Sequence, residues 1–469
     1  MPEIRRFIRL VATLLAITVV AACATLPEPA PMPPTRAVVA SERTDLGRIA
    51  LAARPEVELT GFRLLPAGDD ALATRLELVR RAEVSLDVQY YQIVDDATGR
   101  SFLRALRDAA LRGVRVRLLI DDLYTAGEDE LLLGLAATPN LELRLFNPFP
   151  AGRGGFASRF AASLFDFDRV NRRMHNKLFV ADGAIAVVGG RNIGDAYFKQ
   201  SRGDNFVDLD VAVVGALVPR LGVLFDRYWN SEFVRPIGTV VRHDASPVEL
   251  AHRFDRATDP ATRPPAPDDA PGDGRFVDEL CSGRLDLIWA VAEAWADDPG
   301  RVVGRRVSYG GVPLLDVESV RYNVRERMRR ARSEVTLVSP YLIPGREGLE
   351  AIDEVRGRGV RLALVTNSLA STDEPLVYGA YRRHRPDLLR HGVDIWEVSA
   401  TRTTQSVRLG LLGSRTGRLH SKLAVFDREA FFIGSMNLDP RSDAHNTEIG
   451  VFVDSRPLAA EVMRLSLAA

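Results

Sequence analysis

Two stretches of the chain place the same chemically versatile side chains at the same spacing. Residues 174–192 read MHNKLFVADGAIAVVGGRN, and residues 419–437 read LHSKLAVFDREAFFIGSMN. Each carries a His, a Lys, an Asp, a Gly and an Asn at identical offsets, namely His175, Lys177, Asp182, Gly189 and Asn192, and then His420, Lys422, Asp427, Gly434 and Asn437. An imidazole can serve as base, acid or nucleophile near neutral pH, and a lysine supplies positive charge. Because burying two His–Lys pairs without an anion is unfavourable, we expect both pairs to face an anionic ligand.

A β-hairpin in each copy would bring these groups together. A strand that begins at His175 puts His175 and Lys177 on one face, because side chains alternate along a strand. Asp182-Gly183 is a strong turn signal between two apolar runs, and folding the chain there returns Asn192 to the side of His175. The second copy folds in the same way. Asp182 and Asp427 then lie at the turns, roughly 16 Å along the strand from the lysines, and are expected to be turn residues or distant ion-pair partners.

Further parallels lie upstream of each hairpin. EVSLDVQYYQI (83–93) resembles EVTLVSPYLI (334–343), and GVRVRLLIDDL (113–123) resembles GVRLALVTNSL (359–369). These apolar, β-branched runs predict buried strands, and the helical patterns between them close with glycines. We therefore predict an internal duplication and an α/β fold of two homologous halves. Each half is expected to be a mostly parallel sheet flanked by helices.

The repeated motif, His-x-Lys-x4-Asp followed by Gly-Gly or Gly-Ser and Asn, resembles the double signature of the phospholipase D superfamily. The flanking words GGRNIGDAYF, FVDLDVAVVG and GSMNLDPRSDAHNTEIG are similar to the cardiolipin-synthase-related bacterial branch, especially to the type with a GGRNIG word. The resemblance covers the chain from about Leu59 onward. It implies two halves packed about a pseudo-twofold axis, with both histidines facing one phosphodiester.

The resemblance also implies roles for the site residues. One histidine attacks phosphorus to form a phosphohistidine, and the other protonates the leaving oxygen and then activates the acceptor. Family precedent makes His175 the nucleophile and His420 the general acid and base, although the symmetry of the two copies does not decide between them. The phosphate oxygens are expected to be held by Lys177, Lys422, Asn192 and Asn437. The orienting carboxylates are expected to be Asp210 and Glu448, each of which, taken alone, is equally well explained as a plain strand-edge acid. Arg172 and Arg173 are further candidates for phosphate contacts. No metal or cofactor is expected.

The N-terminus carries the pattern of an export signal. Three arginines in MPEIRRFIRL precede a short apolar run, and Val20-Ala21-Ala22-Cys23 resembles a bacterial lipobox, in which lipid is attached to the Cys. The alternative is an ordinary signal peptide that happens to end near a Cys. The proline-rich ATLPEPAPMPPTR favours an extended spacer. We therefore expect a lipoprotein anchored through Cys23 and facing the periplasm, with Ala24 favouring the outer membrane.

These features divide the chain into five segments. We predict a lipoprotein signal peptide over residues 1–22, a spacer over 23–45, a first half over 46–242, a linker over 243–275 and a second half over 276–469. The linker holds six prolines and is interpreted either as a floppy join or as a loop folding over the site. The second half looks shortened at its C-terminus relative to this branch.

The composition narrows the class of function. The 469 residues carry 62 basic and 62 acidic side chains, and a formal net charge of +0 disfavours a dedicated nucleic-acid binder. The expected lipid anchor and this neutral balance favour a membrane phospholipid as the substrate, and the resemblance implies a phosphatidyl transfer. A phosphatidyl group would pass from phosphatidylglycerol or phosphatidylethanolamine to phosphatidylglycerol, forming cardiolipin. The alternatives are a phospholipase D hydrolase, an extracytoplasmic nuclease or other phosphodiesterase, and a tethered lipid-binding protein with a dead site. A monomer would suffice, because one chain holds both half-sites.

Overall fold

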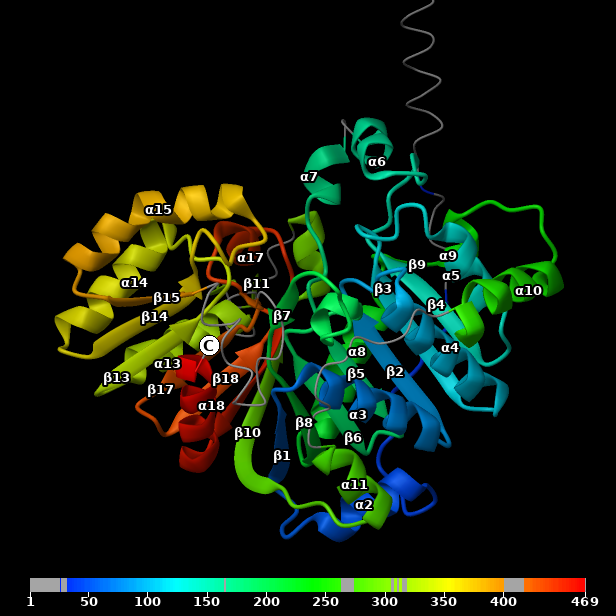
Figure 1. The fold of residues 1–469 in the computed structure, drawn as a ribbon, viewed down its shortest axis with the longest axis horizontal. Coiled ribbons are helices and arrows are strands. Elements are labelled where there is room, and N and C mark those ends of the chain that lie inside the picture. The colour runs from blue at the N-terminus through cyan, green and yellow to red at the C-terminus, as the bar shows by residue number, and fades with distance from the viewer. Residues whose placement is uncertain are drawn as a thin grey trace, which may run out of the picture.

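The computed structural model describes residues 26, 32–163, 166–262, 274–304, 308–309, 312–313, 319–399 and 417–468. The predicted signal peptide, Cys23 and part of the predicted linker lie outside these ranges. Both halves of the chain contain strands and helices in a similar order (Figure 1).

The first half and the segment after it contain α2 (Asp45–Ala53), β1 (Thr60–Leu65), α3 (Gly68–Arg81), β2 (Ser85–Tyr90), α4 (Ala97–Leu111), β3 (Arg115–Asp121), α5 (Asp129–Ala136), β4 (Leu141–Phe146), α6 (Phe156–Ala162), α7 (Phe167–Val170), β5 (Leu178–Ala181), β6 (Ile185–Gly189), β7 (Asn205–Val207), β8 (Asp210–Gly215), α8 (Val218–Trp229), β9 (Val234–Pro236), α9 (Ile237–Val240) and α10 (Pro247–Ala257). The second half contains α11 (Arg275–Ser282), β10 (Ile288–Ala296), β11 (Ser308–Tyr309), β12 (Val312–Pro313), α13 (Val320–Arg330), β13 (Glu334–Val338), α14 (Gly345–Gly357), β14 (Arg361–Asn367), α15 (Pro375–Arg390), β15 (Asp394–Val398), β16 (Gly417–Leu419), β17 (Leu423–Phe426), β18 (Ala430–Gly434), α17 (Pro440–Ala444), β19 (Ile449–Asp454) and α18 (Arg456–Ala468). Short 3-10 turns occupy Asp195–Tyr197, Pro260–Thr262 and Pro299–Val303.

The local sequence explains these boundaries, as α4 illustrates. The helix begins after Asp96, whose side chain accepts a hydrogen bond from the backbone N–H of Gly99. Phe102, Leu106 and other apolar residues at helical spacing are buried along one face. The chain then leaves the helix through Gly113, whose φ of 100° suits a residue without a Cβ.

One fifteen-stranded sheet runs through the molecule in the order β15-β14-β13-β17-β18-β19-β10-β1-β8-β6-β5-β2-β3-β4-β9. Counted outward from the centre, β1-β8-β6-β5-β2-β3-β4 in one half match β10-β19-β18-β17-β13-β14-β15 in the other. The halves meet where β1 and β10 pair antiparallel, with Thr60 opposite Ala290. Equal strand orders on the two sides of an antiparallel seam are what a twofold relation produces. The predicted pair of homologous α/β halves is therefore confirmed.

The sheet is mixed, which corrects the expectation of a mostly parallel sheet in each half. In the large sheet, β2-β3-β4 and β13-β14-β15 pair in parallel, and the other neighbouring strands pair antiparallel. The strand–helix–strand segments form the parallel units as predicted. The hairpins with the repeated motif are antiparallel, because a tight turn can join strands only in that direction.

The hydrophobic core is continuous across the seam between the halves. A central cluster combines Phe225 of α8 and Leu458 of α18 with apolar side chains from the strands of both halves. Two outer clusters lie in the helical layers, one beneath α3, α4 and α5, the other beneath α13, α14 and α15. Helix α18 follows β19 as α8 follows β8, so these two helices correspond in the two halves.

Part of the predicted linker is helical. Leu250 and Phe254 of α10 are buried against α5, where Gly134 leaves room for the close approach. The described part of this segment is thus packed onto the first half. Among the described residues, none of the helices combines the length and apolar character that a membrane span would need.

Candidate active site

The two repeated motifs form matching hairpins. Strand β5 pairs with β6, with Leu178 opposite Val188, and β17 pairs with β18, with Leu423 opposite Ile433. The strands begin after the lysines rather than at the histidines. The His-x-Lys segments precede these strands, and the backbone N–H of each histidine bonds to the opposite half of the molecule.

The motif acids lie at the hairpin turns. Asp182, with a φ of 49°, accepts hydrogen bonds from the backbone N–H groups that lead into β2, at 2.8 Å from Val84 and 2.9 Å from Ser85. Asp427, with a φ of 53°, does the same for the residues that lead into β13, at 2.7 Å from Ser333 and 3.0 Å from Glu334. Each acid therefore links its hairpin to the strand beside it, β2 in the first half and β13 in the second.

The halves exchange backbone hydrogen bonds beside the histidines. The N–H of His175 donates to the carbonyl of Thr447 at 2.8 Å, and the N–H of His420 donates to the carbonyl of Val207 at 2.8 Å. Strand β16, which leads to His420, pairs in parallel with β7 of the first half. Each histidine is therefore attached to the residue just before an acid of the other half.

Those acids hold the two imidazole rings. Nδ1 of His175 lies 2.9 Å from Oε2 of Glu448, and Nδ1 of His420 lies 2.7 Å from Oδ2 of Asp208. Both carboxylates are almost fully buried. The orienting interaction thus crosses between halves in both directions, and it leaves Nε2 of each ring available for substrate.

Asp208 occupies the place that the sequence comparison assigned to Asp210, and that assignment is corrected. Oδ2 of Asp210 lies 2.8 Å from Arg75 and 3.3 Å from Arg191, both of them buried. The aligned words DLDVAV and EIGVFV contain the signal that was missed, since an acid, an aliphatic residue and alternating valines match Asp208 with Glu448. Asp210 instead neutralises two buried guanidinium groups.

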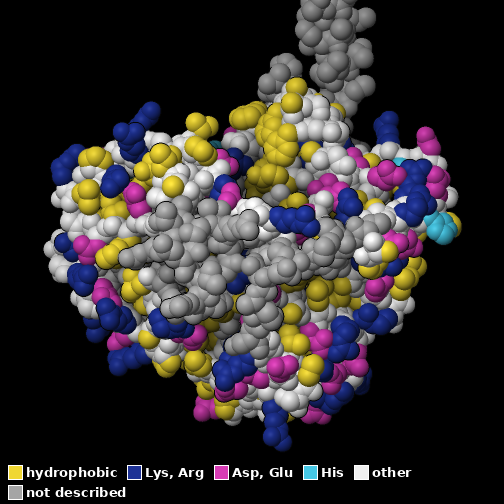
Figure 2. Space-filling view, in the orientation of Figure 1, with side chains coloured by type: hydrophobic (Ala, Val, Ile, Leu, Met, Phe, Trp, Pro, Cys, Tyr) yellow, Lys and Arg dark blue, Asp and Glu magenta, His cyan; other side chains and the backbone are white. Residues whose placement is uncertain are grey.

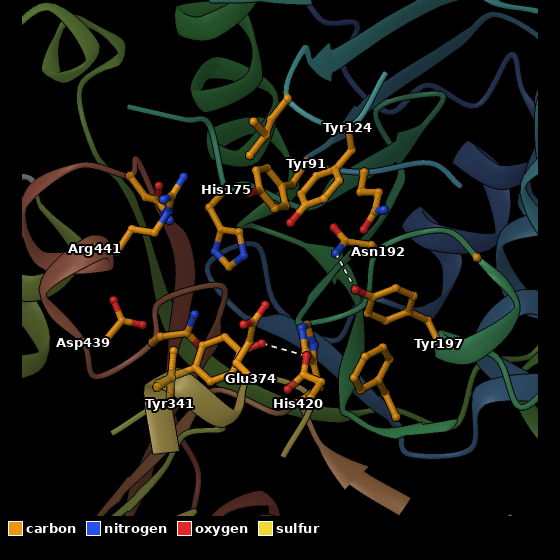
Figure 3. Close-up of a pocket in the computed structure, with 18 of the residues that line it drawn as sticks. Tyr91, Tyr124, His175, Asn192, Tyr197, Tyr341, Glu374, His420, Asp439 and Arg441 are labelled. Atoms are coloured by element: carbon orange, nitrogen blue, oxygen red, sulfur yellow. Dashed lines mark hydrogen bonds between the residues drawn. The ribbon is translucent and has the colours of Figure 1, made fainter. Parts of the chain in front are cut away.

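Both histidines face one cavity of about 710 Å³. Their rings come from opposite sides of this space, as Figure 3 shows. Asn192 and Asn437 also line it, and Nδ2 of Asn192 donates to the hydroxyl of Tyr197 at 2.9 Å. The structure thus brings the two histidines and both asparagines to a single substrate space.

The two lysines lie beneath the histidines and are buried. Nζ of Lys177 donates to the carbonyl of His175 at 2.7 Å, while Nζ of Lys422 donates to the carbonyl of His420 and lies 3.1 Å from its Nδ1. Burial lowers the pKa of Lys177 well below its usual value and lowers the pKa of Lys422 to about 8.

The electrostatic environments of the two histidines differ. Burial, followed by the charges of Lys177 and Lys422, holds the pKa of His175 well below its usual value. Burial and Lys422 also lower the pKa of His420, but Asp208 opposes them.

The orienting acids differ as well. Burial raises the pKa of Glu448 to about 7. Burial would also raise the pKa of Asp208. The hydrogen bond and charge of His420, with the charges of Lys422 and Arg191, outweigh burial and lower this pKa to about 2. Asp208 is therefore the firmly ionised member of the pair.

Other cavity residues were not anticipated from the motifs, and they include Tyr91, Tyr197, Tyr341, Asp373, Glu374, Asp439 and Arg441. They come from segments that follow strands, mostly loops, where sequence spacing carries little information. The two arginines considered as phosphate ligands have other partners. Arg173 is buried against Asp121, and Arg172 pairs with Asp168. Arg441, rather than Arg172 or Arg173, lines the cavity that the two histidines share.

Comparisons with known proteins agree with this geometry. The sequence matches the family described as "Cardiolipin synthase, PLD-like domain" over residues 76–229 and 324–465. Cardiolipin synthase C of Escherichia coli (strain K12) is 39% identical over 402 residues, which cover 83% of this chain and 80% of that protein. A cardiolipin synthase of Staphylococcus aureus (strain Mu50) is 26% identical over 404 residues, which cover 86% of this chain and 65% of that protein. The crystal structure of phosphatidylserine synthase from Haemophilus influenzae Rd KW20 shares the fold, with a TM-score of 0.57, 14% identity and 90% of both chains covered.

Proposed function

Because the chain belongs to the cardiolipin synthase family of phospholipase D-like proteins, we propose that it transfers phosphatidyl groups through a covalent intermediate on His175. The observation that carries the proposal is the shared cavity of His175 and His420, in which a buried carboxylate holds Nδ1 of each ring. Two imidazoles oriented in this way present two Nε2 atoms to one phosphodiester.

In the first step, Nε2 of His175 attacks the phosphorus of a phospholipid and forms a P–N bond. The bond from phosphorus to the head-group oxygen breaks, and His420 donates its Nε2 proton to that oxygen. Glu448 accepts the Nδ1–H of His175, so the lone pair stays on Nε2. Lys177 and Lys422 supply positive potential beneath the site as negative charge grows on the phosphoryl oxygens.

In the second step, the hydroxyl of an acceptor lipid enters the position that the head-group alcohol left. His420, now neutral, removes the hydroxyl proton as the oxygen attacks phosphorus and the P–N bond breaks. His175 is released as a neutral imidazole, and His420 is again protonated. One phosphodiester replaces another, so the exchange needs no external energy source.

The unequal environments of the histidines support the assignment of roles. A nucleophile must be neutral, and burial together with the charges of Lys177 and Lys422 holds the pKa of His175 well below its usual value. An acid must hold a proton, and the ionised Asp208 favours the protonated form of His420.

Cardiolipin formation is the reaction we propose for this site. The donor is phosphatidylglycerol or phosphatidylethanolamine, and the acceptor is a hydroxyl of phosphatidylglycerol. The relatives named as cardiolipin synthases support this choice, and the cavity is large enough for a phospholipid head group with part of its glycerol backbone. If water reached the intermediate instead, the product would be phosphatidic acid.

The decisive experiment combines trapping with product analysis. Purified protein is mixed with phosphatidylglycerol labelled at phosphorus, with and without phosphatidylethanolamine, and is quenched with base, in which phosphohistidine survives. We expect label on the peptide that contains His175, loss of that label in His175→Ala, and cardiolipin in the lipid fraction. His252→Ala, on the exposed face of α10, is the matched control.

Other results would reassign the reaction. Label found only on the His420 peptide would exchange the two roles. Phosphatidic acid as the sole product would make the protein a hydrolase. Turnover of DNA without turnover of any phospholipid would refute the lipid assignment altogether.

We also propose that Cys23 carries a lipid anchor that holds the site beside a membrane facing the periplasm. The support is the lipobox-like Val20-Ala21-Ala22-Cys23 and the proline-rich segment after it. Metabolic labelling with a fatty acid, followed by fractionation, tests this tether. Membrane retention of an unlabelled Cys23→Ala variant would show that another feature holds the protein.

A further inference from the structure

An aromatic wall leads from His175 to the surface of the molecule. Consecutive ring contacts connect His175 to Tyr91, Tyr91 to Tyr124, Tyr124 to Phe156, Phe156 to Phe160, and Phe160 to Phe167, with ring centroids separated by 4.8, 5.2, 5.5, 6.0 and 6.1 Å in that order. The first four aromatic residues of this series line the cavity. Figure 3 shows Tyr91 and Tyr124 lying beside His175. We call Tyr91, Tyr124, Phe156, Phe160 and Phe167 the aromatic track.

The outer end of the track is exposed on a protruding pair of helices. Helices α6 and α7 stand above the sheet in Figure 1, and hydrophobic side chains gather over them in Figure 2. Phe156 is 42% exposed and Phe167 is 50% exposed, whereas Phe149 and Val170 are fully buried and attach the helices to the domain. Packing of α6 and α7 therefore does not account for the two exposed rings.

The charges around the track do not favour a nucleic acid. Arg153 lies 2.7 Å from both Asp122 and Asp129, and Arg169 lies 2.6 Å from Asp166. Arg172 is paired with Asp168, which is 80% exposed. A strand of nucleic acid stacked on these rings would need free cations for its phosphates. Arg153, Arg169 and Arg172 are already paired with carboxylates, so they do not supply such free cations around the outer rings.

The opposite side of the cavity is polar. Tyr341 donates to Asp373 at 2.8 Å, and Glu374, Asp439 and Arg441 are charged side chains that line this side beside the apolar Ile343 and Val377. Figure 3 shows Tyr341, Asp439 and Arg441 across the cavity from the tyrosines of the track. The cavity thus has an apolar wall that ends at His175 and a polar wall on the side of the second half.

We propose that the aromatic track binds an acyl chain of the donor phospholipid and that α6 and α7 seat their exposed rings in the bilayer. This inference rests on the proposed function, because it orients the same substrate in the same site. The acyl chains then lie on the side of His175, which takes up the phosphatidyl group. The head group and the acceptor alcohol lie against the polar wall, where His420 exchanges protons with them. A lipid can reach the buried histidine along continuous apolar surface without first leaving the membrane.

Residue-specific quenching tests the contact with the bilayer and does not depend on catalysis. Phe156→Trp, Phe167→Trp and the control Leu111→Trp are prepared in the full chain, and wild-type emission is subtracted. Leu111, at the end of α4, is 60% exposed and lies away from the cavity. With vesicles that contain lipids brominated on their acyl chains, we expect the added emission at positions 156 and 167 to fall at least about twofold. The emission at position 111 should stay unchanged. Equal quenching at all three positions, or none at 156 and 167, would overturn the proposal.

A kinetic comparison tests binding of the acyl chain. For Phe156→Ser acting on vesicles of long-chain phosphatidylglycerol, we expect the apparent KM to rise about tenfold, as the loss of a partly buried aromatic contact predicts. The loss should be clearly smaller with monomeric dihexanoyl phosphatidylglycerol, because its short chains reach mainly the inner rings of the track, and Leu111→Ser should match wild type on both substrates. An unchanged KM on vesicles, or an equal loss on both substrates, would refute the track. Wild-type protein that turned over no phospholipid would refute the proposed function instead, while the quenching result would still decide whether α6 and α7 enter the bilayer.

Discussion

Replacing Glu448 with Gln should make the protein more stable at alkaline pH and nearly inactive. Glu448 is buried beside His175, and its pKa is raised from the ordinary 4.5 to about 7. Near pH 4 the carboxyl group is protonated in both the folded and the unfolded chain, so its ionisation has no effect on stability. As the pH rises from 4.5 to 7, the unfolded chain releases this proton while the folded chain retains it. The free energy of unfolding therefore falls over this interval.

The size of the effect follows from the shift in pKa. A shift of about 2.5 pKa units corresponds to about 3 kcal/mol at 1.36 kcal/mol per unit. A glutamine avoids the ionisation, so Glu448→Gln should exceed wild type by up to about 3 kcal/mol at pH 8 and equal it near pH 4. Asp208 provides the opposite case, since its pKa is lowered from 3.8 to about 2. Asp208→Asn should therefore lose about 2 kcal/mol at any pH above about 4.

Both substitutions should abolish most of the activity for the same geometric reason. The new amide N–H would donate to Nδ1 of the histidine and move the ring proton to Nε2. In Glu448→Gln this removes the lone pair that attacks phosphorus. The corresponding amide substitution in a serine protease triad lowers kcat by about 10⁴-fold. Activity and stability at pH 8 are thus expected to change in opposite directions in Glu448→Gln and in the same direction in Asp208→Asn.

The assay is thermal unfolding at pH 5, 6, 7 and 8, combined with phosphatidyl transfer at pH 7.5. Glu350→Gln, on the exposed surface of α14, is the control for loss of a negative charge and should show no pH-dependent difference from wild type. The argument fails if Glu448→Gln is less stable than wild type at pH 8. That result would mean that the ionised carboxylate stabilises the fold and that its burial does not dominate.

Three further outcomes are expected. Asp210→Asn should lower the free energy of unfolding by about 3–5 kcal/mol, because Arg75 and Arg191 would remain buried without their carboxylate. Full stability with lost activity would instead indicate that Asp210 orients a histidine, as the sequence predicted. Asp182→Ala should lower stability by about 2–4 kcal/mol in urea unfolding, because three backbone N–H groups at the start of β2 lose their acceptor. The kcat of the folded protein should stay within about twofold, and a lower kcat at full stability would contradict this. The value of kcat/KM should fall above about pH 8, where Lys422 loses its proton. A pH profile that is flat to pH 10 would show that the charge of Lys422 is not required.

Much of the fold could be predicted because it is encoded in local patterns that occur twice. The apolar runs, the turn at Asp182 and the paired glycines at 189 and 190 each specify one step of a hairpin. A second occurrence at matched positions makes a chance pattern improbable. The prediction of mostly parallel sheets was wrong because the parallel units are conspicuous in sequence, whereas the antiparallel neighbours β8 and β19 are joined to their hairpins through longer segments.

The first orienting acid shows where such reasoning stops. Asp208 and Asp210 are two residues apart in VDLDVA, and both are buried. The backbone contact between Val207 and His420 places Asp208 beside the ring, while Arg75 and Arg191 bind Asp210. Alignment of the two copies matches Asp208 with Glu448, but it does not report that Asp208 contacts His420 or that Arg75 and Arg191 bind Asp210.

The sequence by itself determined the chemical groups, their duplication and the hairpins that present them, because spacing and alternation along a strand are local properties of the chain. Only the tertiary structure decided which acid holds which histidine. Glu448 is 273 residues from His175, and Asp208 is 212 residues from His420. Those pairings exist because the two halves bond to one another beside the site. The aromatic track was decided in the same way, since its rings come from separate loops and helices that approach one another only when the core is packed.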